Sequence, residues 1–259
     1  MRLVSWNLNS LRARLPRLLE LLAEHAPDVV CLQETKLAAG QLPHLELTAA
    51  GYHAVDHSTG RWNGVAILVP TDVDAHAVQV GLPDEPNPDE GRWIEATVGR
   101  VRIASVYVPN GREPGHPMFA EKLAFLEAMR DRVGHLVAEG PTVVAGDLNV
   151  APEDRDVWDP TVFEGATHVT PDERARLAAI LAAGLRDAYR TAEPEGEGFT
   201  WWDYRMGAFR RGMGMRIDLA LVSDHLAVRG CVVDTRYRRT NEAGDKPSDH
   251  APLVCELDV

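Results

Sequence analysis

The sequence lacks any apolar run long enough to cross a lipid bilayer. The longest run, from Leu177 to Leu185, has nine residues and is bounded by Arg176 and Arg186, whereas a membrane-spanning helix needs about 20 apolar residues. Near the N-terminus, Asn7 interrupts the apolar stretch that a signal peptide would require. We therefore expect a cytoplasmic protein with no membrane segment.

Cysteine is also scarce. The three cysteines, Cys31, Cys231 and Cys255, are far apart and form no C-x-x-C spacing, which argues against a zinc site or a dithiol redox motif. Cys31 and Cys255 stand in apolar runs. We expect all three to be buried, reduced thiols that pack as small hydrophobic groups.

Basic residues are outnumbered, with 27 lysines and arginines against 39 acidic residues and a net charge of −12. A nucleic-acid-binding domain usually carries an excess of positive charge, but binding depends on the local field. The segment from Arg205 to Arg216 contains four arginines and no acidic residue, and Arg236, Arg238 and Arg239 form a second cluster. Acidic residues at a metal site would add to the negative total, so the charge leaves nucleic-acid binding open.

The length of 259 residues and the ordinary hydrophobic content predict one globular domain over residues 1–259. Helices are predicted from Pro16 to His25, from Pro117 to Val137, and after a capping box that begins at Thr170. Several predicted strands are continuous apolar runs, as expected when both faces are covered. The predicted strands are Leu3–Trp6, Val29–Gln33, Val65–Val69, Trp93–Val98, Val101–Val108, Thr142–Ala145, Ile217–Val222 and Leu253–Leu257.

Strands and helices are mixed along the chain, and a hairpin through Gly99 and Arg100 adds an antiparallel pair. This pattern predicts an α/β fold: a four-layered α/β sandwich in which two mixed β-sheets pack face to face with helices outside.

Polar side chains fall where the predicted strands begin or end, the region where α/β folds gather their functional groups. Asp147 and Asn149 are two residues apart, so both face the same side of an extended chain. Their occurrence together with the others indicates one site. The set is Asn7, Glu34, Tyr107, Asp147, Asn149, Asp218, Asp249 and His250.

Six segments that carry these residues run from the first predicted strand to the last: Ser5–Arg14, Leu32–Lys36, Tyr107–Gly111, Gly146–Pro152, Arg216–Asp218 and Pro247–Pro252. In this order and spacing, the chain resembles the exonuclease III family of abasic-site endonucleases, within the endonuclease/exonuclease/phosphatase superfamily. The resemblance covers essentially the whole chain. It implies a DNA repair nuclease that cuts 5′ of abasic sites in duplex DNA, with 3′–5′ exonuclease and 3′-phosphatase activity.

Hydrolysis of a phosphodiester requires neutralising the anion, placing a water in line and stabilising the leaving oxygen. The resemblance implies a Mg²⁺ or Mn²⁺ cofactor, which suits oxygen ligands. Glu34 is the strongest candidate ligand, with Asn7 and Asp249 binding directly or through water. The whole candidate metal set is Asn7, Glu34, Asp147, Asn149, Asp249 and His250.

The candidate catalytic residues have separate roles. Asp147 orients or deprotonates the attacking water, and Asn149 fixes that water or the phosphate. Tyr107 offers its phenol to the phosphate or the leaving group. His250 donates to a phosphate oxygen, and Asp218 holds its ring and raises its pKa so that it is cationic.

The choice of substrate depends on the stretch from Phe199 to Asp218. Alone it would be an aromatic core strand and a solvated arginine loop. Beside the catalytic set it resembles the family's abasic-sugar pocket, with Trp201, Met215 and Ile217 as apolar walls, since a sugar without its base is swung out at low cost. DNA partners then include abasic sites and blocked 3′ ends. The candidate DNA-contacting residues are Arg205, Arg210, Arg211 and Arg216, with Arg12, Lys36 and Asn110 as lesser ones.

Two alternatives remain open at this stage. A metal-dependent phosphatase of lipids or sugars on the same fold should lack the stretch from Trp201 to Ile217. A catalytically silent DNA-binding protein should lack catalytic residues, and none is missing here. The expected assembly is a monomer.

Overall fold

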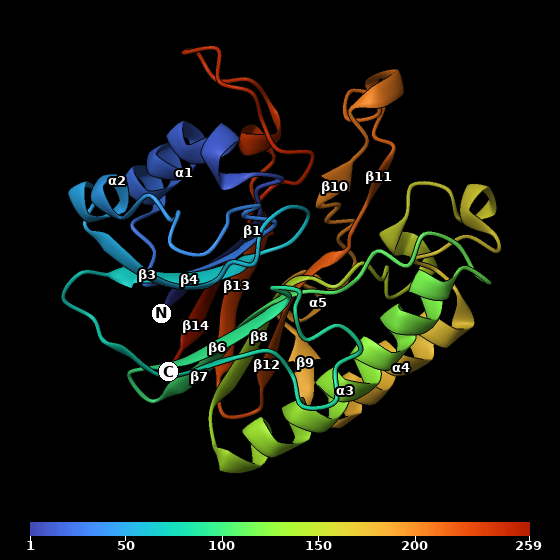
Figure 1. Ribbon diagram of the computed structural model, residues 1–259. Helices are drawn as coiled ribbons and strands as arrows, with labels where there is room; N and C mark the ends of the chain where they lie inside the picture. The colour runs from blue at the N-terminus through green and yellow to red at the C-terminus, as the bar shows by residue number, and fades with distance from the viewer.

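Two six-stranded sheets form the centre of the protein in a computed structural model that describes residues 1–259 (Figure 1). Each sheet contains one parallel pair, β1 with β2 and β7 with β8, and is otherwise antiparallel. The first sheet has the order β13 (Ala227–Val233), β14 (Leu253–Asp258), β1 (Arg2–Asn7), β2 (Val29–Gln33), β4 (Val65–Pro70), β3 (Tyr52–His57). The second has the order β5 (Ala75–Val80), β6 (Trp93–Val98), β7 (Val101–Tyr107), β8 (Thr142–Asp147), β12 (Asp218–Ser223), β9 (Leu185–Asp187).

Strand β4 shows why these apolar runs become central strands. Val65, Ile67 and Val69 belong to the core between the two sheets, whereas Ala66 and Leu68 belong to a second core under the N-terminal helices. Successive side chains of a strand point to opposite faces, so a continuous apolar run is required where both faces are covered.

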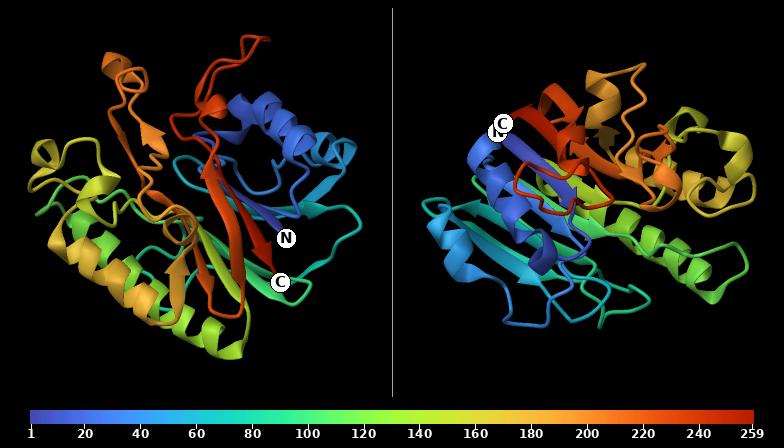
Figure 2. Two further views of the ribbon diagram at one scale, coloured as in Figure 1. Left: turned by 180° about the vertical axis from the view of Figure 1, so that it is seen from behind. Right: turned by 90° about the horizontal axis from the view of Figure 1, so that it is seen from above.

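Helices cover the outer face of each sheet (Figures 1 and 2). Apolar side chains of α1 (Leu11–His25) and α2 (His44–Ala49) pack on the first sheet, and those of α3 (Pro117–Glu139) and α4 (Pro171–Ala182) pack on the second. The predicted four-layered sandwich is therefore confirmed. A short helix α5 (Ala188–Ala192) packs on β12 and β13. None of the helices has the length and apolar character that crossing a membrane demands.

The predicted boundaries differ from the structure at α1, which begins at Leu11 because the Ser10 side chain accepts a hydrogen bond from the Ala13 amide. Pro16 therefore lies inside the helix. Strands β3, β5, β9 and β13 were not predicted. β5 is almost wholly exposed and β13 has a register shift between Val228 and Gly230, so neither has a continuous apolar run to reveal it.

The cysteines also need a correction. All three are buried, as expected, but the structure joins Cys231 and Cys255 in a disulfide, so only Cys31 is a free thiol. The pair lies directly across from each other on the antiparallel strands β13 and β14, with Cα atoms 4.0 Å apart. The two residues are 24 positions apart in sequence, and their pairing comes from strand register, which their spacing did not predict.

Three segments project beyond the same end of the sheets (Figure 1). One carries the two-stranded ribbon of β10 (Trp201–Trp202) and β11 (Gly214–Met215) with η3 (Arg205–Gly207). Another follows η4 (Thr235–Arg238), and the third carries η1 (Asp154–Asp156) and η2 (Pro160–Phe163). Figure 2 shows them from behind and from above.

Candidate active site

A cavity of about 220 Å³ lies at this end of the two sheets. Of its eleven lining residues, ten were candidates from the sequence, so the fold brings the predicted site together. The eleventh is His168. The lining residues are Glu34, Tyr107, Asn110, Asp147, Asn149, His168, Trp201, Met215, Ile217, Asp249 and His250.

Strand order explains the convergence. Strand β1 ends at Asn7, and Glu34 directly follows its parallel partner β2. Strand β7 ends at Tyr107, and its parallel partner β8 ends at Asp147. Asp218, at the start of the antiparallel strand β12, lies opposite Asp147. The carboxyl ends of these parallel strands and the amino end of the antiparallel strand β12 lie at the same end of the sheets. Five residues from distant parts of the chain therefore meet there: Asn7, Glu34, Tyr107, Asp147 and Asp218.

Asn7 joins the two sheets at this edge. Its amide nitrogen Nδ2 donates to Glu34 Oε1 over 2.8 Å and to Asp147 Oδ2 over 2.9 Å. Glu34 Oε2 pairs with Lys36 Nζ at 2.8 Å. One neutral amide therefore holds two carboxylates close together, and the Lys36 ammonium compensates the charge of Glu34.

Asp218 orients His250. Asp218 Oδ2 accepts a hydrogen bond from His250 Nδ1 at 2.8 Å, which leaves His250 Nε2 facing Asp147 Oδ2 at 3.8 Å. Burial opposes the charge on the imidazole, but the carboxylates of Asp218, Asp147 and Asp249 outweigh it and raise the pKa of His250 to about 10. His250 is thus a cation at neutral pH, directed at the cavity.

The residues fit a divalent cation. A carboxylate oxygen of Glu34 and one of Asp147 lie within 4.8 Å of each other and of a His250 ring nitrogen. Only the two carboxylates offer lone pairs to a cation, because the His250 ring is protonated. Burial, and then the charge of Asp218, raises the pKa of Asp147 to about 8, although His250 opposes the shift. The raised pKa means that the surroundings of Asp147 do not fully stabilise its ionised form. A hard divalent cation, which prefers oxygen ligands, would supply the missing positive charge.

Asp249 lines the cavity but has other partners. Its Oδ1 accepts from Asn9 Nδ2 at 2.9 Å, and its Oδ2 accepts from Trp201 Nε1 at 3.1 Å. Burial alone would raise the pKa of Asp249, but the His250 charge and these two donors lower it. Asp249 is therefore an anion that also fixes the Trp201 ring.

Asn149 and Tyr107 flank Asp147. The main-chain N–H of Asn149 donates to Asp147 Oδ1 at 3.0 Å, and the side-chain Nδ2 of Asn149 donates to the Val108 carbonyl at 2.9 Å. Burial, with the charges of Glu34 and Asp147, holds the pKa of Tyr107 well above its ordinary value. Tyr107 is accordingly a neutral donor.

Sequence reasoning missed His168. Its Nδ1 lies 2.6 Å from the Asn149 carbonyl and its Nε2 lies 3.4 Å from Asn110 Nδ2. Burial, and then the Lys122 charge, lowers the pKa of His168 to about 4, so the ring is neutral. A single histidine in a loop has no local signal, and only the Thr170 capping box two residues later marked this stretch.

The predicted apolar wall is present. Trp201 pairs with Met215 across the β10–β11 ribbon, and Met215 and Ile217 form a small buried cluster against which Trp201 packs. An isolated bridge joins Trp201 to His250. The apolar wall and the acidic centre therefore line one cavity.

Arg216 does not reach the surface. Its guanidinium is 1% exposed and pairs with Asp156 at 2.7 Å and Asp187 at 2.5 Å. The expectation that Arg216 contacts the DNA backbone is therefore wrong, because two buried carboxylates bind the guanidinium inside the protein.

The other basic candidates have a different environment. Arg205, Arg210 and Arg211 are exposed on the projecting ribbon, although Arg205 pairs with Asp203. Arg12 is exposed at the start of α1, and Lys36 lies beside the cavity through its pair with Glu34.

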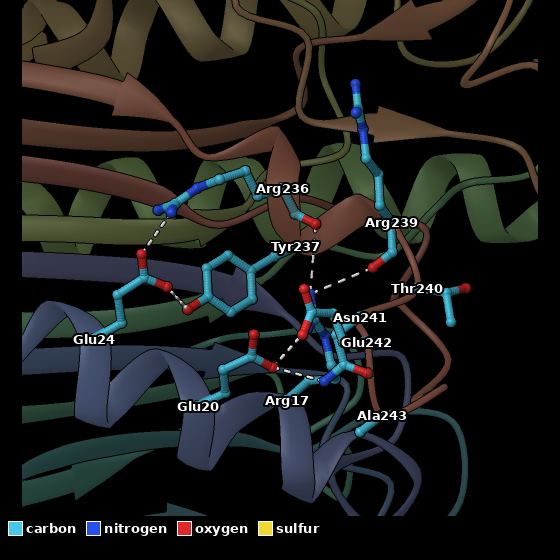
Figure 3. A pocket seen from close by; sticks show the side chains of 10 residues that line it. All are labelled: Arg17, Glu20, Glu24, Arg236, Tyr237, Arg239, Thr240, Asn241, Glu242 and Ala243. Carbon is cyan, nitrogen blue, oxygen red and sulfur yellow. Dashed lines mark hydrogen bonds and ion pairs between the residues drawn. The ribbon is translucent and has the colours of Figure 1, made fainter.

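A larger hollow of about 610 Å³ lies between α1 and the segment after η4 (Figure 3). Two of its arginines are paired: Arg236 with Glu24, and Arg17 with Glu20 (Figure 3). It contains no cluster of ligand or nucleophile groups like that of the cavity above. Arg236 is thus paired within the protein and Arg238 is buried, whereas Arg239 is exposed.

Comparisons with known proteins agree with the geometry. Residues 4–250 match the model of the endonuclease/exonuclease/phosphatase family. The chain is 31% identical to exodeoxyribonuclease III of Haemophilus influenzae, over 99% of this chain and 100% of that protein. Among solved structures it is similar to the 3′ phosphatase NExo from Neisseria bound to a product DNA hairpin, with a TM-score of 0.95, 37% identity and full coverage of both chains. It is also similar to an AP endonuclease from Archaeoglobus fulgidus, with a TM-score of 0.92, 34% identity and full coverage of both chains.

The fold, the site and these relatives agree, so the chain belongs to the endonuclease/exonuclease/phosphatase family and is a DNA repair nuclease of its exonuclease III and AP endonuclease branch.

Proposed function

We propose that the protein hydrolyses the phosphodiester bond on the 5′ side of abasic sites in duplex DNA, with Mg²⁺ or Mn²⁺ as cofactor. One observation carries this proposal: the acidic centre around Glu34 and Asp147 shares its cavity with the apolar wall of Trp201, Met215 and Ile217. A sugar without a base is flipped out at low cost and fits against such a wall, which places the neighbouring phosphate near the acidic centre.

Glu34 and Asp147 would hold the metal ion, with Asn7 and Asp249 assisting directly or through water. The protonated His250 ring has no lone pair for the metal and faces the phosphate instead. When bound, the cation neutralises phosphate charge and stabilises the leaving oxygen.

Each polar side chain has a proposed task. The His250 imidazolium, fixed by Asp218, donates to a non-bridging phosphate oxygen and stabilises its growing charge. Asp147 orients the attacking water and accepts its proton. Asn149 and Asn110 present amide groups to the phosphate, and the neutral Tyr107 phenol donates a hydrogen bond to the phosphate or the leaving group.

The DNA backbone on either side would lie along the exposed cations. We propose Arg205, Arg210 and Arg211 for the projecting ribbon, and Arg12 and Lys36 for the side of the first sheet. Neutralising phosphates in this way gives affinity that does not depend on base sequence.

A second activity, removal of phosphate groups from DNA 3′ ends, is favoured by the similarity to a protein named as a 3′ phosphatase. Such a substrate needs the acidic centre but no flipped sugar. His168 and Asn110 on the cavity wall offer polar partners for a terminal group.

The deciding experiment incubates the purified protein with three duplexes: one with a single abasic site, one with a 3′-phosphate end, and one undamaged. Each is run with Mg²⁺ and with EDTA. We expect Mg²⁺-dependent nicking 5′ of the abasic site. Phosphate release from the 3′ end without any nick at the abasic site would overturn the primary proposal in favour of the second. Asp147→Asn protein serves as the control for contaminating nucleases.

A further inference from the structure

An ion pair lies buried beneath the active site, between the two outer helices. Lys122 of α3 and Glu173 of α4 are each 0% exposed and pair directly. Neither residue lines the cavity. The pair therefore has no access to substrate, and any effect on the reaction must pass through the residues that it contacts.

Lys122 binds the main chain of the loops that follow β7 and β8. Its Nζ lies 2.6 Å from the Asn149 carbonyl oxygen and 3.2 Å from that of Asn110. It also donates to Thr167 Oγ1 at 3.2 Å. An ammonium group has three protons and no acceptor, so its four acceptors occupy all of them, with one proton shared between two acceptors.

Glu173 binds the third loop of the cavity wall. Its Oε1 accepts from the His168 amide at 2.9 Å and from the Thr167 hydroxyl at 2.9 Å, while its Oε2 accepts from the Thr170 amide at 3.0 Å. The same hydrogen bond at Thr170 forms the capping box of α4. The start of α4 and the His168 loop are thus fixed by one carboxylate.

Two features show how closely these parts fit. Gly111 has φ +84°, and a Cβ there would lie 2.8 Å from Lys122 Cδ, so a larger residue would displace the lysine. Asn149 has φ 51°, a conformation that non-glycine residues adopt at an energetic cost unless their surroundings hold them. The Lys122 and His168 hydrogen bonds to the Asn149 carbonyl provide such a hold.

Stability does not by itself account for the pair. Exchanging a buried ion pair for neutral groups of similar volume is often neutral or stabilising, because the pair loses its hydration on burial. Here every hydrogen bond of Lys122 beyond the pair ends on a loop that carries a cavity residue or on the neighbouring Thr167.

We propose that Lys122 and Glu173 are positioning residues for phosphodiester hydrolysis: they hold the main chain at Asn149 and Asn110 so that both amide side chains face the reacting phosphate. The two amides lie side by side, with Asn110 Nδ2 3.4 Å from Asn149 Oδ1. This inference rests on the role proposed above for those amides.

The test uses a double variant, Lys122→Met with Glu173→Gln, which removes both charges and keeps the approximate volume of both side chains. We measure the single-turnover rate at saturating DNA, the Kd for DNA, and the melting temperature. We expect the rate to fall about 10- to 100-fold, since small misplacements of a catalytic group have effects of that size, with Kd changed less than about twofold. A loss confined to Kd would overturn the proposal.

The kinetic coupling to Asn149 separates positioning from general destabilisation. In an Asn149→Ala background, the double variant should cause a smaller fold loss of rate than in the wild type, because one of the two groups that it positions is gone. The same fold loss in both backgrounds would overturn the proposal. Glu95→Gln is the matched control: Glu95 is also 0% exposed and paired, with Arg102 and Arg132, and none of these lines the cavity. If the double variant and Glu95→Gln lower the melting temperature equally and the double variant loses no more rate than Glu95→Gln, the proposal is also overturned.

Thr167→Val is a milder probe that removes the hydroxyl between Glu173 and the Asn110 carbonyl. It should lower the rate severalfold without changing Kd, and it replaces the double variant if that protein does not fold. Cleavage of the abasic duplex by the wild type tests the proposed function separately. If the wild type acts only on the 3′-phosphate duplex, the same comparisons are made there.

Discussion

Asp218 Oδ2 and His250 Nδ1 lie 2.8 Å apart inside the protein, although 32 positions separate them in the sequence. The contact fixes the direction of the ring. It also supplies the first of the charges that overcome burial and hold the pKa of His250 at about 10. The carboxylates of Asp147 and Asp249 face the same imidazole and act in the same direction.

The pH dependence of the rate follows from this contact. Because the pKa of His250 is raised, its imidazolium is present at all lower pH values and is lost as the pH rises through about 10. Asp218→Asn should move the alkaline limb of the single-turnover rate profile toward neutral pH by more than about one unit, since the nearest compensating charge is gone. An alkaline limb that does not move would remove His250 from the reaction or Asp218 from its support.

Removal of the metal ion should abolish cleavage. Glu34 Oε1 and Asp147 Oδ2 share the Asn7 amide as donor, and two such carboxylates favour a divalent cation. Glu34→Gln should raise the Mg²⁺ concentration needed for half-maximal rate without lowering the melting temperature of the apoprotein. Full activity after EDTA treatment and gel filtration, or an unchanged Mg²⁺ titration in the variant, would contradict the assignment.

Asp147→Asn should keep the fold and DNA binding while slowing the reaction. The change removes the proposed proton acceptor and keeps the volume, and general acid–base groups contribute about 10²–10⁴-fold. The measurement is the single-turnover rate, with the DNA Kd as control. Retention of more than about a tenth of the rate would show that another group accepts the proton.

Much of this site could be predicted from the sequence because its residues follow strands that the apolar pattern reveals. Asp147 ends a strand of mainly apolar residues, and Glu34 directly follows another such strand. The sandwich could be predicted for the same reason: continuous apolar runs mark the strands that lie inside the two sheets. β5 escaped prediction since it lies exposed at a sheet edge, and such a strand needs no continuous apolar run.

What the sequence could not reveal are contacts between distant side chains. Arg216 lies in the motif beside Asp218, yet Asp156 and Asp187 take its guanidinium into the interior. Asp187 belongs to the short strand β9, which has no sequence signal of its own. His168 reaches the cavity through a hydrogen bond to Asn149, nineteen positions away. Neither the ion pairs of Arg216 nor the hydrogen bond of His168 corresponds to a pattern in the neighbouring sequence.

The exposed arginines of the ribbon should contribute to DNA binding through charge alone. Each neutralised phosphate adds roughly one unit to the slope of log Kd against log salt. Arg210→Ala with Arg211→Ala should therefore flatten that slope by up to about two units on damaged and undamaged duplexes alike. Arg130→Ala, on the exposed face of α3, is the control and should leave the slope unchanged. A slope that changes only on damaged DNA would mean that the two arginines read the lesion.

Trp201 should matter for the choice of substrate. Its ring stands between the acidic centre and the Met215–Ile217 cluster, and its Nε1 donates to Asp249 Oδ2 at 3.1 Å. Trp201→Ala removes the wall against which a flipped sugar would lie, so it should reduce activity on an abasic duplex more than on a 3′-phosphate end, where no sugar is flipped. Trp201→Phe is the matched control, because it keeps an aromatic wall and loses only the hydrogen bond to Asp249. If Trp201→Phe retains the abasic preference and Trp201→Ala loses it, the apolar surface is responsible. Equal losses on both substrates, together with a lowered melting temperature, would mean that Trp201 acts only in packing.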